Sequence, residues 1–557
     1  MKVRILISSV CMLLALSGSR VLADSASPAD FMGSGDDREP LFDGLGDIHH
    51  KVSTNAPFAQ QFFDQGASFI YAFNLPEALG SFREAARRDP NLAMAYWGIA
   101  LALGPNYNAP PDAEQGKKAF AAITKAKSLE SNATESERGF IDALAKRYPA
   151  NGLVDDAHAK AYADAMRDLA RHYPDDADAN TMFAESLMDL HPWMLWTRDG
   201  QPAPGTEEIV ATLEATIAKH SKHSGANHYY IHAVEASKNP GRALPEADRL
   251  TKLAPGAGHL VHMPSHIYFR VGRYDDAAKA NAHAIRVDRA YIRERGDKND
   301  YAMMYYPHNI DFLWASYMME GNQRESRKAA RELAEAVPFE AAHGFPMAEE
   351  LASPVILTEV RFAEWKDVLK TKAPPPDLAY STVIWHYGRG MAFAAQGDST
   401  GAASELAQLE SSRAKIASGL IFETQPATRF AEIASLTLKG EQEIAAGKAD
   451  AGLSDLKAAV AAQDALDYNE PPPWYAPVRQ IYGVELLKAG RAQDAEQVFR
   501  EDLAQYPENG WSLHGLVIAL RARGNSQEAD AVAARFKKAW AHADIRLSDP
   551  DEKTARR

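Results

Sequence analysis

Histidines are concentrated in one stretch of this chain, residues 227–268, which contains five of the 18 histidines in the sequence. His228 and His232 are four residues apart, and so are His262 and His266. Side chains at this spacing lie on one face of a helix, so two such pairs can face each other across neighbouring helices. Imidazole pairs of this kind hold zinc, copper or iron. The stretch therefore predicts a transition-metal site.

Two carboxylates follow candidate ligands at helical spacing. Glu235 lies three residues after His232, and Asp311 lies three residues after His308. On a helix, each carboxylate is close enough to orient the imidazole or to accept a proton from it. Glu235 and Asp311 are therefore the candidate catalytic residues.

The residues between the histidines limit which metals and which classes of metal site fit the sequence. The segment HYYIH lacks the glutamate that zinc peptidases carry between two histidines as general base, which argues against that class. Several imidazoles with few obligatory carboxylates suit copper or zinc better than magnesium or calcium. The paired histidines are similar in style to those of dinuclear copper proteins, and an iron site of two histidines with Glu235 is a further alternative.

The elements that must position these side chains are helices. From Ala59 onward the chain shows helical periodicity without a convincing strand pattern, and it repeats. Residues 60–90 fit a helix-turn-helix unit with small residues where the helices approach, aromatic residues between them and a final proline. The matching positions are Gly66, Phe69, Ala78, Phe82, Ala85 and Pro90. On these positions the chain resembles the tetratricopeptide-repeat family.

Other segments match the same pattern more loosely, and between Pro105 and Pro204 the register is lost although amphipathic helices continue. The looser matches lie at residues 266–285, 316–338, 390–406, 440–459 and 481–507. The resemblance implies an all-α, tetratricopeptide-like helical-repeat solenoid, a right-handed superhelix of helix hairpins. Its first helices would line a concave groove, and the usual occupant of such a groove is a peptide or a partner protein.

The repeat positions assign the histidines to the first helices of three consecutive units. His228 and His232 fall on the first helix of one unit, the group at 259–266 on the next first helix, and His308 on the one after. In tetratricopeptide arrays these positions face the groove. We therefore predict six metal ligands in one concavity, holding one or two ions of copper, zinc or iron: His228, His232, His259, His262, His266 and His308.

A second polar cluster occurs in the segment AESLMDLHPWMLW. Glu185 and Asp189 share a helix face, and His191 follows just before a proline. We interpret the cluster as a capped helix end packed by neighbouring tryptophans; the alternative is a general base or extra ligands at the groove. The loop GPNYN, residues 104–108, is interpreted as a structural turn, with a place at the groove rim as the alternative.

The first 23 residues have the features of a secretory signal peptide. A basic start precedes an apolar run, Ile5 to Leu16, and small residues end at Ala23, after which we expect cleavage. The run is too short to span a membrane, so the mature chain is predicted to have no membrane span. Cleavage would also remove Cys11, the only cysteine, which leaves His, Asp, Glu and Met as metal ligands. We expect a periplasmic or secreted protein.

The composition bears on partners and on domains. The formal net charge of the chain is −14, which argues against nucleic acid as a partner. Residues 24–56 are rich in Ser, Asp, Gly and Pro and are predicted to form an extended leader, in which the pair at 49–50 is solvent-exposed or folds over a site. We divide the remainder into helical regions 57–204, 205–345, which is rich in histidine, and 346–557.

The segments HYYIHAVEAS and HLVHMPSHIYFRVGRYDDA, with the opening repeat, are similar to a group of exported bacterial tetratricopeptide-repeat proteins. This resemblance implies the fold and export, but no reaction. The leading hypothesis is an exported metalloprotein, an oxidoreductase or hydrolase if it is an enzyme. The alternative is a non-catalytic scaffold that binds a peptide or partner protein in its groove and uses the histidines as polar contacts.

Overall fold

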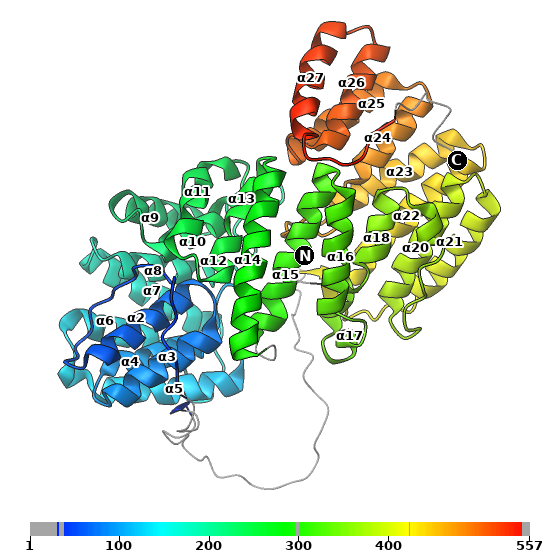
Figure 1. Cartoon of the computed structure of the whole chain (residues 1–557). Helices are drawn as coiled ribbons and strands as arrows, with labels where there is room; N and C mark the ends of the chain where they lie inside the picture. The colour runs from blue at the N-terminus through cyan, green and yellow to red at the C-terminus, as the bar shows by residue number, and fades with distance from the viewer. Residues whose placement is uncertain (1–30, 33–37, 297–299, 423, 549–557) are drawn as a thin grey trace.

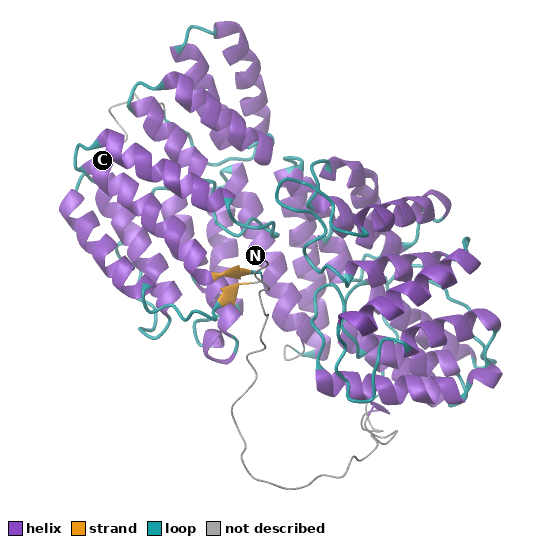
Figure 2. Ribbon diagram, turned by 180° about the vertical axis from the view of Figure 1, so that it is seen from behind, coloured by secondary structure: helices purple, strands orange, loops and turns teal. Residues whose placement is uncertain are grey.

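The computed structural model describes residues 31–32, 38–296, 300–422 and 424–548 (Figure 1). The predicted signal peptide lies outside the described residues. Within the described part, the two strands β1 (Ile421–Phe422) and β2 (Gln425–Pro426) form a short antiparallel hairpin, and the regular elements are otherwise helices (Figure 2). The all-α prediction is confirmed. None of the described helices is long and apolar enough to cross a membrane.

Helices pack mainly against their neighbours in sequence, as antiparallel hairpins such as α2 with α3 and α4 with α5. The N-terminal helices are α2 (Pro57–Tyr71), α3 (Leu75–Arg88), α4 (Ala93–Ala102), α5 (Ala113–Ser128), η1 (Glu130–Asn132), α6 (Glu135–Ala145), α7 (Asp156–His172), α8 (Ala177–Met188) and α9 (Thr206–Lys219). Helices therefore continue through residues 105–204, where the repeat register is lost.

The middle of the chain holds the histidine-bearing helices. They are α10 (Ser224–Glu235), η2 (Pro240–Ala243), α11 (Leu244–Leu253), α12 (Gly258–His262), α13 (Pro264–Arg270), α14 (Tyr274–Arg295), α15 (Asp300–Glu320) and α16 (Gln323–Ala336). Polar residues cap these elements: Asn322 accepts from the backbone N–H of Glu325 at the start of α16, and the His223 ring accepts from that of Ala226 at the start of α10.

The C-terminal part continues the array of hairpins. Its helices are α17 (Ala341–Gly344), η3 (Pro346–Ala352), α18 (Pro354–Arg361), α19 (Trp365–Val368), α20 (Ala379–Ala395), α21 (Ser399–Arg413), α22 (Ala427–Ala445), α23 (Ala449–Asp464), α24 (Val478–Lys488), α25 (Ala492–Gln505), α26 (Gly510–Ala522) and α27 (Ser526–Ala539). In Figure 1, α24 to α27 project beyond the other helices of this half. The Trp511 indole N–H of α26 donates to the Met318 carbonyl oxygen, 3.0 Å away, and so ties this end to α15.

One packing unit occurs near both ends of the array. Phe82 of α3 fills the space between α2 and α4, where a Cβ added to Gly66 or Gly98 would come within 2.6 Å or 2.4 Å of its ring. Phe499 of α25 lies in the same way between Gly483 of α24 and Gly515 of α26. The glycine–phenylalanine–glycine spacing is identical in the two units. These contacts are the physical basis of the repeat signature.

Substituting Gly66 with alanine tests this packing. The added methyl group would overlap the fully buried ring of Phe82, so α2 and α3 would have to separate. We expect a loss of about 1–3 kcal/mol in the free energy of unfolding, as for other overpacked cores. Denaturant unfolding measures it. Gly344, a glycine of α17 without a positive φ whose added Cβ would meet nothing within 4 Å, is the control, and an equal loss in both variants would contradict the packing argument.

The described part of the leader, residues 38–56, has no helix or strand and packs against the N-terminal helices. Leu45 and Val52 are buried in the first hydrophobic cluster. The Gln65 side chain bonds the leader at Pro40 and Phe42, and the Ser53 backbone N–H donates to Glu137 at 2.6 Å. The division into regions at 204/205 and 345/346 stays a prediction.

Candidate metal centre

The six predicted ligands come from three consecutive hairpins, and the structure brings them together. His228 and His232 lie on α10, two histidines on α12, one on α13, and His308 on α15. Met263 and Pro264 separate α12 from α13, with Pro264 at the first position of α13, where its missing N–H is tolerated. The chain continues in nearly the same direction, so His262 and His266 stay adjacent.

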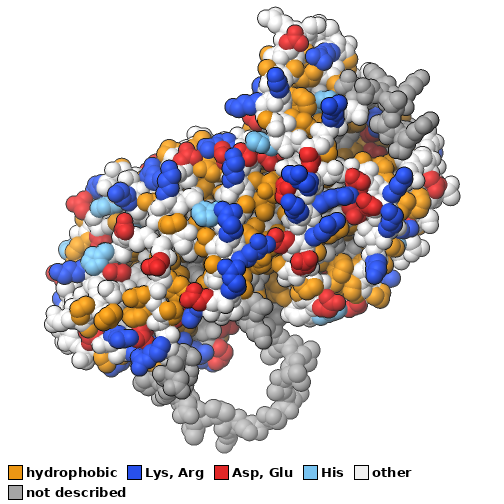
Figure 3. Space-filling model, viewed as in Figure 1, with side chains coloured by type: hydrophobic (Ala, Val, Ile, Leu, Met, Phe, Trp, Pro, Cys, Tyr) orange, Lys and Arg blue, Asp and Glu red, His pale blue; other side chains and the backbone are white. Residues whose placement is uncertain are grey.

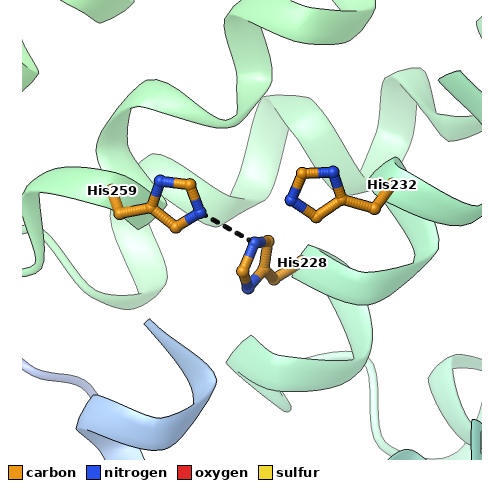
Figure 4. A group of neighbouring side chains, drawn as sticks. All are labelled: His228, His232 and His259. Atoms are coloured by element: carbon orange, nitrogen blue, oxygen red, sulfur yellow. Dashed lines mark hydrogen bonds between the residues drawn. The ribbon is translucent and has the colours of Figure 1, made fainter. Parts of the chain in front are cut away.

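The first triad consists of His228, His232 and His259, whose ligand nitrogens lie within 4.8 Å of one another. The Nε2 atoms of His228 and His259 are 3.1 Å apart, and Figure 4 shows the three rings converging from two helices. Each side chain is at most 2% exposed. The Nε2 atom of His232 and the Nδ1 atom of His259 are buried without a hydrogen-bond partner.

The second triad consists of His262, His266 and His308, again with ligand nitrogens within 4.8 Å. The Nε2 atom of His262 is 2.7 Å from that of His266 and 3.2 Å from that of His308. His262 and His266 are buried, whereas His308 is partly accessible. All three rings therefore direct Nε2 to one point.

Glu235 joins the two triads. Its two carboxylate oxygens accept separately, one from His232 Nδ1 at 2.9 Å and the other from His266 Nδ1 at 2.5 Å. Burial raises the pKa of this carboxyl, but the His266 and His232 rings outweigh burial and lower the pKa to about 2. Glu235 is therefore ionised and acts on both triads at once, from the side of the rings that faces away from the convergent Nε2 atoms.

Acceptors on the Nδ1 side fix the tautomers of the rings. His228 Nδ1 lies 2.7 Å from the Tyr71 carbonyl oxygen, and His262 Nδ1 lies 2.6 Å from Asn281 Oδ1. The Asn281 amide nitrogen donates to the Ala277 carbonyl oxygen, so Oδ1 is the atom that faces His262. Each Nδ1 must therefore carry the proton, which leaves the Nε2 lone pairs of these rings free.

Two of those lone pairs face each other. Burial and the neighbouring imidazoles lower the pKa of His262 well below 6.5, and burial also lowers that of His266, so both rings are neutral at pH 7. Their Nε2 atoms, 2.7 Å apart, then have no proton to share. Two lone pairs at this distance repel, and a cation placed near them removes the repulsion. Outer hydrogen bonds on Nδ1 with open Nε2 atoms are the usual arrangement of imidazole ligands.

Aromatic side chains enclose both triads. Phe73 lies against His228, with ring centroids 4.6 Å apart, and Phe312 lies against His262 and His266 at 5.1 and 5.0 Å. Tyr305 of α15 is 4.6 Å from His259. These rings make the surroundings of the triads apolar on several sides.

The loop at 104–108 closes the site on the side of the first triad. Tyr107 stacks on Trp193, with centroids 5.4 Å apart, and lies 5.3 Å from the His232 ring. The Asn108 amide donates to the Tyr305 hydroxyl at 3.1 Å. The loop is thus a turn, as interpreted, and it also covers the histidines.

The histidines do not line an open groove. Five of them are at most 2% exposed, and side chains of the first hydrophobic cluster surround them. The groove positions of the repeat are covered here because the end of α2, the 104–108 loop and α15 close over α10 and α12. The six predicted residues lie together, but the prediction that they line a concave groove was wrong, because five of them are buried.

Burial makes the stability of the metal-free protein depend on pH. It lowers the pKa of five of the rings, well below 6.5 for three of them and to about 3 for His308. The unfolded chain then binds more protons than the folded one below pH 6.5, so stability falls as pH falls from about 6.5 toward 3, by about 1.4 kcal/mol per pH unit for each ring.

Denaturant unfolding of the metal-free protein at pH 7.5, 6.5 and 5.5 measures this dependence. We expect the free energy of unfolding to decrease at each step below pH 6.5. In His308→Gln the free energy of unfolding should fall less steeply with pH, and the slope should be smaller by the contribution of about one proton. A profile that is flat from pH 7.5 to 5.5 would contradict buried neutral rings.

The other predicted residues lie elsewhere. Asp311 is half-buried on α15 and is not part of either triad or of the Glu235 group. Asp189 pairs with the buried Arg147, 2.5 Å away, and burial raises the pKa of Glu185. These contacts make a structural ion-pair cluster at the end of α8, in line with the interpretation of a packed helix end.

The two leader histidines differ in exposure. His49 is exposed, while the His50 ring folds in and bonds Asp178 of α8 at 2.8 Å. The Tyr71 hydroxyl donates to the same carboxylate at 2.5 Å. Because the Tyr71 carbonyl also orients His228, the leader is connected to the first triad through two residues, Asp178 and Tyr71.

Sequence reasoning missed the residues that orient and enclose the ligands. Tyr71 lies on α2 and Phe73 in the turn after it, far from the histidines in the chain. Asn281 lies on α14, the opposing helix of a hairpin. They carry no spacing signal. For the loop at 104–108, which contains Tyr107, the sequence predicted a structural turn, with a place at the groove rim as the alternative.

Comparison with known proteins gives little further information. No protein-family model matches the sequence, and neither does any curated protein. A solved structure of human IFIT1 with m7Gppp-AAAA is 12% identical over 88% of this chain and 92% of that chain, with a TM-score of 0.33. The structure of yeast Tom70 is 12% identical over 86% of this chain and 92% of that chain, with a TM-score of 0.27. The P58(IPK) TPR domain is 11% identical over 84% of this chain and 99% of that chain, with a TM-score of 0.20. These scores are too low to carry an argument, so the tetratricopeptide-like fold rests on the hairpins and their packing.

Proposed function

We propose that this protein is a metalloprotein that holds two transition-metal ions, one in each histidine triad, in a dinuclear centre. The observation that carries the proposal is the pair of neutral rings, His262 and His266, whose Nε2 atoms lie 2.7 Å apart while each Nδ1 is committed to an acceptor. A polar cluster that is buried and repulsive when empty is stabilised by a cation. Two rings of each triad have an outer acceptor on Nδ1: His228 and His232 in the first, His262 and His266 in the second.

The charge of the site favours copper. Neutral imidazoles supply the ligands, and Glu235 is the one carboxylate within the described histidine groups of this region. Two monovalent ions would leave one net positive charge in the buried site, whereas two divalent ions would leave three, and uncompensated buried charge is costly. Copper(I) is monovalent and accepts three nitrogen ligands, so it fits better than zinc or iron(II).

The enclosure of the site favours a small-molecule substrate. Side chains at most 2% exposed leave no place for a macromolecular substrate beside His228 or His262. A small molecule such as dioxygen fits this situation, and copper supplies one-electron chemistry when bound. Within the chain, Glu235 would hold the rings in position and keep the Nδ1 protons on the outer side of the centre.

Elemental analysis of untagged protein after it has been offered copper(I), zinc(II) and iron(II) in separate samples tests the proposal. We expect about two equivalents of copper and less of the other metals. The His232→Ala/His266→Ala variant should hold little copper, and His386→Ala, in an ion pair with Glu405 on a different hairpin, should hold as much as the unmodified chain. Circular dichroism confirms that each variant is folded.

If the protein bound almost none of any metal, the metalloprotein proposal would be contradicted. The helical array would then be interpreted as a scaffold, with a peptide or protein ligand elsewhere on its surface. Figure 3 shows basic and acidic side chains interspersed over the face in view, which gives no single-sign surface for such a ligand.

We also propose that the chain is exported. The basis is the signal-peptide pattern of residues 1–23. N-terminal sequencing of the protein recovered from the periplasm or the medium should begin at Asp24. Recovery of full-length protein from the cytoplasm alone would contradict export.

A further inference from the structure

His308 differs from the other five ligands because its side chain is partly accessible. Metal must reach the buried triads from outside, and His308 is the ligand nearest to solvent. Its Nε2 atom is 3.2 Å from that of His262, which continues to His266 at 2.7 Å. The second triad is therefore a row of three nitrogens, and it ends at the one ligand of the six that is partly accessible.

Two methionines lie on the surface just before His308 on the same helix. Met303 is 56% exposed and Met304 is 45% exposed, although methionine is usually buried. Met304 precedes His308 by four residues and so lies one turn away on the same face of α15. The Cα–Cβ bonds of a helix tilt toward its N-terminus, so the His308 side chain leaves the backbone on the side of the turn that carries Met304, with Pro307 between the two residues in the same helix.

The chemistry of the thioether selects among metals. Methionine sulfur is a soft ligand that binds copper(I), whereas zinc(II) in proteins takes cysteine, histidine and carboxylate ligands. The charge of the buried site independently favours a monovalent ion. An exposed thioether one helical turn from the partly accessible end of a buried histidine row is thus suited to copper(I) uptake.

We propose that Met304 is the surface site where copper(I) first binds and from which it passes to His308. This proposal rests on the proposed copper function. Transfer is a ligand exchange: the bond from copper to the methionine sulfur breaks as a bond to His308 Nε2 forms, and copper stays monovalent. The ion then reaches His262 and His266.

The test compares loading rates. Metal-free protein and the Met303→Leu/Met304→Leu variant are mixed with copper(I) held by a coloured chelator, and the transfer of copper is followed by absorbance. Leucine keeps the apolar volume but has no sulfur. We expect the variant to load copper roughly tenfold more slowly, to reach the same final stoichiometry and to load zinc(II) at an unchanged rate. Met347→Leu, a third exposed methionine on η3, should load copper at the normal rate.

The outcomes separate this inference from the proposed function. Normal copper loading by the double variant, with two equivalents bound at the end, would overturn the methionine site and leave the dinuclear centre intact. Equal slowing of copper and zinc would show that the substitutions alter access to His308 and that no sulfur ligand selects copper(I), which also overturns it. Failure of the unmodified protein to take up copper would remove both proposals.

Discussion

The substitution His262→Ala is expected to reduce bound copper from about two equivalents to about one. His262 is the central ligand of its triad, since its Nε2 atom contacts those of both His266 and His308. Without it, two imidazoles are left to hold that ion. The triad of His228, His232 and His259 keeps all of its nitrogens and its own acceptors. Elemental analysis combined with copper(I) competition measures the loss.

Two companion variants make this result specific. His259→Ala should remove the ion of the other triad, and combining it with His262→Ala should abolish binding. His386→Ala serves as the matched control, because this ring bonds Glu405 at 2.7 Å on a hairpin that contributes no ligand. If folded His262→Ala still bound two ions, or bound none, two independent triads would be the wrong description.

The substitution Glu235→Gln should weaken metal binding without removing a ligand. A carboxylate accepts from both His232 and His266, but an amide offers one oxygen and one N–H₂ group. The ring that faces the N–H₂ group must move its proton to Nε2 and then loses its ligand lone pair. We expect the affinity of the affected ion to fall about 10–100-fold, the range seen when such outer partners are lost. A competition titration with a copper(I) chelator of known affinity measures it.

Glu405→Gln is the matched control for this variant. Glu405 also accepts from a histidine, His386, and from Arg389 at 2.8 Å, but it lies among the C-terminal hairpins. Its substitution should leave copper affinity unchanged. An unchanged affinity in Glu235→Gln as well would mean that the carboxylate does not set the ring tautomers, and its role would be limited to charge.

Most of the fold could be predicted from the sequence because repeat packing is local. Gly66, Phe82 and their counterparts near residues 483–515 contact only adjacent helices, so the pattern that encodes them recurs at a fixed spacing. The same reasoning failed for the closure of the groove. That closure depends on contacts such as Phe73 with His228 and Asn108 with Tyr305, which join segments far apart in the chain.

The ligands of the candidate site were accessible to sequence reasoning, and their environment was not. Four-residue spacing placed His228 with His232 and His262 with His266 on common helix faces. No spacing rule indicates that Asn281 fixes the tautomer of His262, because that contact crosses a hairpin. Likewise, the separation of the ligands into two triads depends on the angle between helices, which periodicity does not encode.

The contacts of the Glu235 carboxylate with both triads limit where a helical repeat can be inserted or deleted. Helical repeats such as the Gly–Phe–Gly units are interchangeable parts, since each meets its neighbours through the same apolar surface. The hairpins of α10 and α13 are not, because Glu235 of one orients His266 of the other at 2.5 Å. Inserting or deleting a repeat between them would preserve a stable array and destroy the centre. The three histidine-bearing hairpins therefore form one block, which an inserted repeat cannot divide without loss of the centre.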